Sequence, residues 1–90
     1  MEKKRFQQRL YDCLGQVIAL RRKRLGYSQG DLANQAGVDR AFISSIERGK
    51  RNPSFGAIAR IAAGLRMRIS RLVDNCERCA ITDIDDRNCK

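Results

Sequence analysis

Residues 29–48, QGDLANQAGVDRAFISSIER, decide the fold of this 90-residue chain. Apolar side chains recur at three-to-four spacing on both sides of Gly37, which predicts two short helices that each bury one side. Ala33 is small enough for the point where the helices cross, and Gly37 suits a left-handed stop. An ordinary helical hairpin is the alternative, but these signals together favour a helix-turn-helix motif.

Polar residues mark where the two helices of the motif begin. Ser28 can cap the first helix, and Asp31 three residues later supplies the acidic half of a capping box. Asp39 is expected to cap the second helix with its own side chain. The motif is therefore predicted to span residues 28–48.

The rest of the chain predicts further helices and gives little support for strands. A repeat of apolar residues every four positions predicts a first helix over about residues 5–25, within which Gly15 weakens continuity. Ser54 is expected to cap a fourth helix, and a short fifth helix should follow it. From Cys76 onward the sequence is polar, short and without a clear period. We therefore expect an all-α domain over residues 1–75 and a loosely attached polar tail over residues 76–90.

The charge of the chain favours a polyanionic partner. Its formal net charge is +9, with sixteen basic and six acidic residues in positions 1–75 and a net charge of −1 in positions 76–90. The helical part therefore carries the positive field, which suits nucleic acid or an anionic membrane surface. No apolar run approaches the roughly 20 residues that span a bilayer, and the N-terminus lacks a secretory signal. We expect a cytoplasmic protein without a membrane partner.

Several features speak against an enzyme. The chain contains no histidine, which is the commonest general base and metal ligand. It also has no glycine-rich phosphate loop and no motif that pairs carboxylates for acid-base work. The sequence therefore predicts no catalytic residue, no cofactor and no small-molecule substrate.

The second helix of the motif offers a face for reading DNA bases. Ile43 and Ile46 should point inward, so the opposite face is available to the major groove. Arg40 can donate two hydrogen bonds to guanine, although a solvated arginine near the helix start is the alternative. Phe42 either lies partly buried or contacts a thymine methyl or sugar at the groove edge. The predicted base-contacting residues are Arg40, Ala41, Phe42, Ser44 and Ser45.

A second group of residues around the motif suits contacts to the DNA backbone. Basic and amide side chains can neutralise or bind phosphates, and the amides at the start of the first motif helix add to the field. The predicted phosphate-contacting residues are Ser28, Gln29, Arg48, Lys50, Arg51 and Asn52.

The four cysteines leave three states open. Cys76 and Cys79 form a single CxxC, Cys89 follows ten residues later, and Cys13 is distant in sequence. Four thiolates can hold zinc, but zinc ribbons normally show two such pairs. A reversible disulfide is the second alternative. Free thiols are favoured over both, with Cys13 packed in the core, and no metal site is predicted.

Residues 14–75 resemble the lambdoid-repressor-like, or XRE-type, helix-turn-helix family. The most specific pieces are GYSQ, LANQAGV and ISSIERGKRNPS, which together look like small controller proteins of restriction-modification systems. The resemblance implies a five-helix DNA-binding domain, here with an extended first helix and a short C-terminal tail. It also implies a homodimer that regulates transcription, with helix three in the major groove of a palindromic operator and possible autoregulation. The alternative is an antitoxin-type interaction module with secondary DNA binding.

The resemblance also assigns residues outside the reading face. It implies a structural ion pair between Arg22 and Glu47, and dimer contacts at Ile69, Leu72 and Val73. Arg21 stands at a position that is often apolar in the family. The N-terminal fifteen residues extend the first helix further than is usual in the family, and the cysteine-bearing tail has no counterpart in the family pattern.

Overall fold

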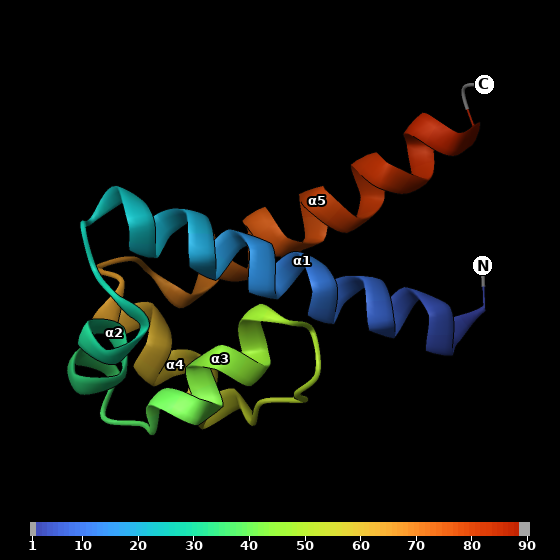
Figure 1. Cartoon of the computed structure of the whole chain (residues 1–90). Coiled ribbons are helices and arrows are strands. Elements are labelled where there is room, and N and C mark those ends of the chain that lie inside the picture. Colours follow the sequence, from blue (N-terminus) through green and yellow to red (C-terminus); the bar gives the residue numbers. More distant parts are fainter. Residues whose placement is uncertain (1, 89–90) are drawn as a thin grey trace.

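The computed structural model describes the backbone of residues 2–88 and the side chains of residues 2–82. The described chain forms five helices and no strands (Figure 1), so the all-α, five-helix prediction is confirmed. None of these helices is long and apolar enough to cross a membrane. The helices are α1 (Lys3–Arg24), α2 (Gln29–Ala36), α3 (Arg40–Glu47), α4 (Phe55–Gly64) and α5 (Ile69–Asn88).

The core draws buried side chains from all five helices. Helix α1 contributes Ile18, which is 1% exposed. The fully buried side chains of the next three helices are Leu32 of α2, Ile43 of α3, Ile61 of α4 and Leu65 directly after α4. Each comes from the apolar side of its element, as the three-to-four spacing predicts. Burying these side chains stabilises the fold by about 1.5–3 kcal/mol each relative to exposure.

The turn between α2 and α3 follows most of the sequence signals. Ser28 and Asp31 form the predicted capping box, since the Asp31 amide donates to Ser28 Oγ at 3.0 Å and the Ser28 amide donates to Asp31 Oδ2 at 2.8 Å. Gly37 ends α2 in the left-handed region at φ 70°. The prediction that the Asp39 side chain caps α3 is wrong, because its carboxylate accepts no hydrogen bond from an amide of α3. Asp39 is exposed, so water can take the place of that bond.

The loop after α3 leads directly into α4. Gly49 has φ 70°, which an L side chain rarely adopts, and it ends the turn that follows α3. Pro53 is buried, and the Ala57 amide donates to Ser54 Oγ at 3.1 Å, so the predicted cap of α4 is confirmed. The exposed side chains between these two points, Lys50, Arg51 and Asn52, are thereby held close to α3.

The largest difference from the sequence prediction is in α5. Residues 76–88 continue the helix that starts at Ile69, so the fifth helix is not short, and residues 76–82 are not a loosely attached tail. Leu72, Cys76 and Ala80, at four-residue spacing, are all buried, with Leu72 and Ala80 at 0% exposure. Figure 1 shows α5 running back along α1, with the beginning of α1 and the end of α5 at the same end of the molecule. The predicted boundary at residue 75 therefore falls inside one packed helix.

The cysteines of α1 and α5 are also not in the favoured state. Cys13 and Cys79 form a disulfide between the two helices, so the free-thiol interpretation is wrong for this pair. Cys13 is nevertheless in the core, as predicted, at 2% exposure. Cys76 is a buried free thiol that donates to the Leu10 carbonyl at 3.1 Å. The disulfide takes two of the four thiolates of the zinc alternative, and Cys89 lies outside the described residues.

Candidate nucleic-acid interface

The position of α3 is fixed first by a close approach to α1. A Cβ added at Gly15 would lie 2.5 Å from the Ile46 carbonyl oxygen and 2.7 Å from that of Glu47. Such distances are too short for any side chain, so only glycine lets the end of α3 pack on α1 here. Gly15 does not interrupt α1, which is continuous through it.

A nearly buried ion pair holds α3 against α1 in the same region. Arg22 donates to both carboxylate oxygens of Glu47, from Nε to Oε2 at 2.7 Å and from Nη2 to Oε1 at 3.0 Å. The two side chains are 11% and 9% exposed. Arg22 also donates from Nη1 to the Tyr27 carbonyl at 2.8 Å, which ties in the segment before α2. The ion pair implied by the family resemblance is therefore present.

The charges of this pair stabilise each other. Burial alone would raise the pKa of Glu47, but hydrogen bonds from Arg22 and Gln29 and the charges of Arg22 and Lys23 together hold it below its ordinary value. The hydrogen bond to Glu47 raises the pKa of Arg22, against the opposing effect of burial. Glu47 therefore serves structure, since removing either partner would leave a buried charge uncompensated.

With the helix fixed in this way, α3 turns one face outward. Ile43 and Ile46 are 0% and 1% exposed, whereas Arg40 and Ala41 are exposed and Ser44 and Ser45 are half-buried. Arg40, Ala41 and Ser44 line a shallow depression together with Gln29 of α2. We call Arg40, Ala41, Ser44 and Ser45 the recognition surface. Ser45 donates its hydroxyl to the Ala41 carbonyl at 3.0 Å, which leaves its oxygen to accept.

The structure gives Phe42 a partly buried position at the edge of this surface. Its side chain packs against the core, and the Arg51 guanidinium lies 5.1 Å from the centre of its ring. This distance is within the range of a cation–π contact. The ring therefore supports the loop that carries Arg51. The partly buried position of Phe42 is confirmed, and its contact with a base or sugar stays a prediction.

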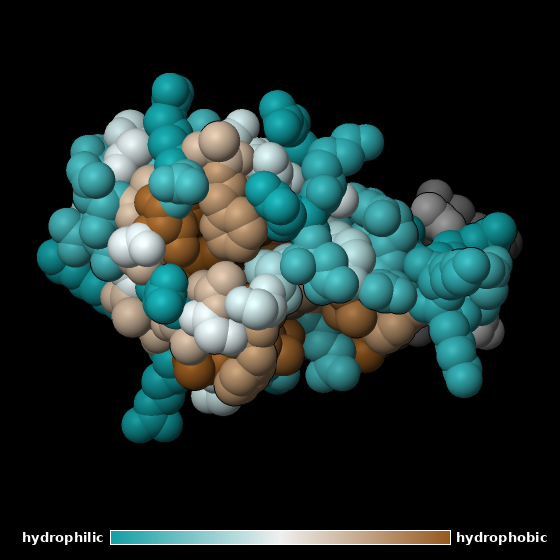
Figure 2. All heavy atoms as spheres, turned by 90° about the horizontal axis from the view of Figure 1, so that it is seen from below, coloured by the Kyte–Doolittle hydropathy of each residue, from teal (hydrophilic) through white to brown (hydrophobic). Residues whose placement is uncertain are grey.

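The predicted phosphate-contacting residues fall into two groups. Ser28 and Gln29 are engaged inside the protein, since Ser28 caps α2 and Gln29 donates from Nε2 to Glu47 Oε1 at 3.1 Å. The remaining four are exposed: Arg48, Lys50, Arg51 and Asn52. The underside of the molecule in Figure 1 is mixed, with hydrophilic side chains around exposed apolar atoms (Figure 2). Hydrogen-bonding groups beside methyl groups are what base edges require.

The predicted dimer contacts need one correction. Leu72 is fully buried within a single subunit, so it belongs to the core and cannot form a surface contact. Leu72, Cys76 and Ala80 share one side of α5, and Cys76 on that side donates to the Leu10 carbonyl of α1. Val73 is 45% exposed, and Ile69 is half-buried beside it.

Two features of the site were missed from the sequence. Gly15 carried a signal, since a glycine inside a strong helical pattern often marks a close backbone approach, although the pattern does not name its neighbour. No local sequence signal indicated the hydrogen bond between Gln29 and Glu47, because the two residues lie on different helices. They come together only where α2 and α3 cross. Both features fix α3.

The comparisons with known proteins agree with this architecture. Residues 18–72 match the model of the helix-turn-helix family HTH_3. The chain belongs to this family, which is the XRE type of helix-turn-helix domain.

Individual relatives are regulators. Over 62 residues the chain is 40% identical to the HTH-type transcriptional regulator SlrR of Bacillus subtilis, covering 68% of this chain but only 41% of SlrR. It is 41% identical over 59 residues to the control protein C.MunI of a Mycoplasma species, covering 66% of this chain and 80% of C.MunI. A similar solved structure is the restriction-modification controller protein C.Esp1396I, as a tetramer with its natural 35 base-pair operator. It has a TM-score of 0.73 and 29% identity, and the match covers 80% of this chain and 95% of C.Esp1396I.

Proposed function

We propose that this protein is a sequence-specific DNA-binding transcription regulator, and that the recognition surface of α3 reads the major groove. The observation that carries the proposal is the outward face of α3, with Arg40 and Ala41 exposed on a helix that Gly15 and the Arg22–Glu47 pair hold in place. Family membership and the operator complex of C.Esp1396I support it. A rigid reading helix is needed because each base contact depends on its geometry.

The chemistry of the recognition surface suggests how it discriminates bases. Arg40 can donate two parallel hydrogen bonds to O6 and N7 of a guanine, which distinguishes that base pair by about 1–3 kcal/mol. Ala41 offers a methyl group to thymine. Ser44 can donate or accept, and Ser45 is left to accept because its hydroxyl is already used within α3. Arg40 is therefore the main specificity residue of the proposal.

The basic residues beside α3 would supply affinity without sequence preference. Arg48, Lys50, Arg51 and Asn52 are exposed around the end of α3 and the loop after it. Phosphate neutralisation by such side chains releases counterions and supplies most of nonspecific binding. Arg51 is held over Phe42, so less side-chain freedom is lost when it binds. Ser28 and Gln29 would act through the amides at the start of α2, because their side chains are occupied.

A controller role with autoregulation is the finer part of the proposal. It is supported by the likeness to C.MunI and C.Esp1396I, and it requires a homodimer on a palindromic operator. The antitoxin alternative depended on a loose tail that folds on a partner. Residues 76–82 are instead packed along α1, so that basis is gone. We further propose that the protein acts in the cytoplasm and without catalysis.

The proposal is tested by selecting bound duplexes from a random pool. The expected product is a palindrome whose half-sites are one helical turn apart, about 34–36 Å, and which also occurs beside this gene. A selected sequence without two-fold symmetry would contradict the dimeric mode. Enrichment of no sequence at all would reject sequence-specific binding.

The proposed dimer surface is tested separately at Val73. Val73→Asp places a charge in an apolar contact and should shift the protein toward monomer in sedimentation experiments. The matched control is Thr82→Asp, at an exposed position on the opposite side of α5 by the helical spacing. If Val73→Asp leaves the dimer intact, this surface is not the interface.

A further inference from the structure

A groove between α1 and α5 gathers much of the basic charge that the recognition surface does not use. It has a volume of about 750 Å³ and lies beside the C-terminal half of α1, the start of α5 and the segment before it. Six arginines and no acidic residue stand among its described lining, which we call the arginine groove. Its arginines are Arg21, Arg24, Arg66, Arg68, Arg71 and Arg78.

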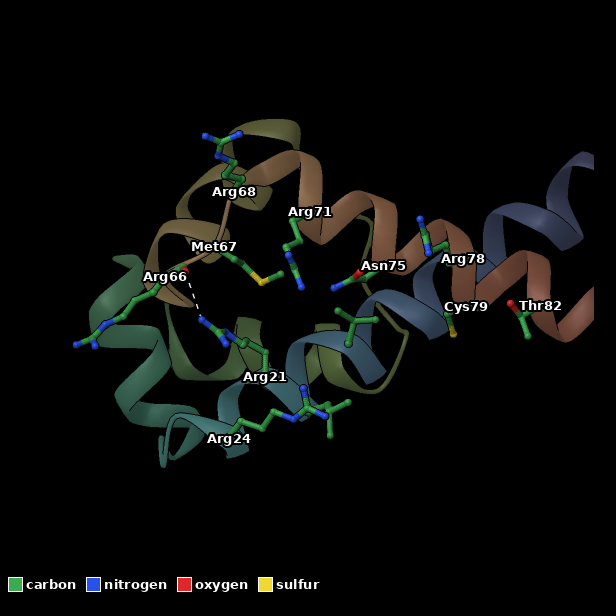
Figure 3. A pocket seen from close by; sticks show the side chains of 12 residues that line it. Arg21, Arg24, Arg66, Met67, Arg68, Arg71, Asn75, Arg78, Cys79 and Thr82 are labelled. Atoms are coloured by element: carbon green, nitrogen blue, oxygen red, sulfur yellow. Dashed lines mark hydrogen bonds between the residues drawn. The ribbon is translucent and has the colours of Figure 1, made fainter.

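Three of these side chains lie along the hollow between α1 and α5. Figure 3 shows Arg71 extending from α5 toward α1, with Asn75 next to it, and Arg21 reaching from α1 toward the Arg66 carbonyl, while Arg24 lies along α1. Arg66 and Arg68 point away from the centre in the same view. Arg78 is paired with Asp74 at 2.9 Å on the exposed side of α5. The centre of the groove is therefore defined by Arg21, Arg24 and Arg71.

Arg21 is held in place by backbone contacts. Its Nε donates to the Leu65 carbonyl at 2.9 Å, and its Nη2 donates to the Arg66 carbonyl at 3.3 Å. These carbonyls follow α4, where a cation is favourable. These bonds fix the Arg21 guanidinium at the groove, where it has no ion pair with any carboxylate among the side chains of residues 2–82.

Arg24 and Arg71 are not neutralised by the protein. Within the side chains described, residues 2–82, neither has an ion-pair or hydrogen-bond partner. Arginines gathered along one groove repel one another, and an anion that they share reduces this cost. The arrangement therefore fits a ligand with at least one phosphate or carboxylate group.

The groove is separate from both proposed interaction surfaces. None of its lining residues belongs to the recognition surface or to the predicted phosphate contacts. Figure 1 shows α3 and α5 on opposite sides of α1. On α5, Arg71, Asn75 and Thr82 share one flank of the helix, whereas Val73 lies about 160° around it by the helical spacing. A duplex on α3 and a partner on Val73 would both leave the groove open.

The remaining lining suggests that the ligand has an apolar part. Val17 and Leu20 of α1 and Met67 line the groove between the arginines, and Leu20 is 55% exposed. The volume is in the range of small-molecule sites, which are about 300–1,000 Å³. We infer that the arginine groove binds a small organic anion, with its phosphate or carboxylate held by Arg21, Arg24 and Arg71 and its apolar group on Val17, Leu20 and Met67.

The test follows the backbone amide signals of the full chain by NMR during titration with phenyl phosphate, with benzoate and with inorganic phosphate. Saturable shifts are expected in residues 20–25 and 66–75, and not in α3. Phenyl phosphate should bind at least about threefold more tightly than inorganic phosphate, because its ring covers apolar surface. Benzoate shows whether a carboxylate can replace the phosphate. Equal affinity for phenyl phosphate and inorganic phosphate would remove the apolar part of the inference.

The matched variants remove the same charge at different places. Arg24→Gln and Arg71→Gln should each weaken phenyl phosphate about fivefold or more, since each removes a charge-assisted bond. Arg60→Gln, on an exposed position of α4 outside the groove, should change affinity by less than about twofold. Equal weakening by Arg60→Gln would show unspecific attraction and overturn the inference. The inference would also be overturned if Arg24→Gln and Arg71→Gln lost duplex binding while Arg60→Gln kept it, because the groove would then contact nucleic acid.

Discussion

The helices α3 and α5 both pack on α1, but they are attached by different chemistry. Helix α3 is held by the bidentate ion pair between its Glu47 and Arg22 of α1, and by the close backbone approach at Gly15 of α1. α5 is held by the Cys13–Cys79 disulfide and by the buried side chains of Leu72, Cys76 and Ala80. The attachment of α3 therefore includes a contact that depends on charge, whereas the attachment of α5 includes one that depends on the redox state. The two attachments can be broken one at a time.

The largest expected effect is on the α3 side. Glu47→Ala leaves the nearly buried Arg22 charge without its partner and should lower the free energy of unfolding by about 3–5 kcal/mol in urea denaturation. The double variant Arg22→Met and Glu47→Leu should recover much of this loss, because it removes both charges and keeps apolar volume. A double variant no more stable than Glu47→Ala would show that the pair acts otherwise than by mutual compensation.

The same pair predicts how stability changes with pH. Because the folded protein holds the pKa of Glu47 below its ordinary value of 4.5, its contribution is present above that pH and is lost as the pH falls toward the folded value. Glu47→Gln should therefore lose less stability than the unmodified chain between pH 5 and acid, in paired denaturation curves taken at about unit intervals. Parallel curves would contradict the assignment.

The next effect is on the α5 side. Cys13 and Cys79 are 66 residues apart, and removing a cross-link over a long loop typically costs about 2–4 kcal/mol through the unfolded chain. We expect this loss when the protein is unfolded in the presence of a thiol reductant. The variant Cys13→Ala with Cys79→Ala should show no further response to the reductant. If the unmodified chain is equally stable with and without reductant, the disulfide does not hold α5.

Cys76 gives a smaller and more local measure of the same attachment. Burial, with a lesser effect of the Glu77 charge, raises the pKa of its thiol to about 11. Because this pKa is raised from 9.0 to about 11, the folded protein holds about a hundredfold less thiolate near neutral pH than the unfolded chain does. Alkylation of Cys76 by iodoacetamide should therefore be slower in the folded than in the urea-unfolded chain by about that factor. Peptide mass spectrometry separates Cys76 from Cys89. Equal rates in the two states would mean that this part of α5 is open.

The sequence predicted the motif well because its signals are local. Ser28, Asp31, Gly37 and Ser54 act on amides or backbone angles within a few residues, so their pattern alone determined the caps and the turn. Asp39 shows the limit of such signals, since an exposed helix end can exchange a side-chain bond for water. The implied Arg22–Glu47 pair was correct because it came from the family resemblance, which carries information about tertiary contacts.

The α5 side could not be predicted in the same way. The extended start of α1 and the cysteine-bearing tail were two separate departures from the family pattern, and the structure shows that they pack on each other. Cys76 and Ala80 are small and not strongly apolar, so their four-residue spacing from Leu72 gave a weak helical signal. The arginine groove has no local pattern at all, because Arg21 and Arg71 line one groove only through the packing of α5 along α1.

The central claim, that α3 reads DNA bases, is tested most directly by the specificity ratio of Arg40→Ala. This ratio compares affinity for the selected palindrome with affinity for a scrambled duplex at one salt concentration. Arg40→Ala should lower this ratio by the equivalent of about 1–3 kcal/mol of binding free energy per half-site. It should also relax the preference at one base pair of each half-site. Lys50→Ala, the control, should weaken both duplexes alike and reduce the salt slope by about one. An Arg40→Ala protein that loses affinity equally for both duplexes would contradict the account.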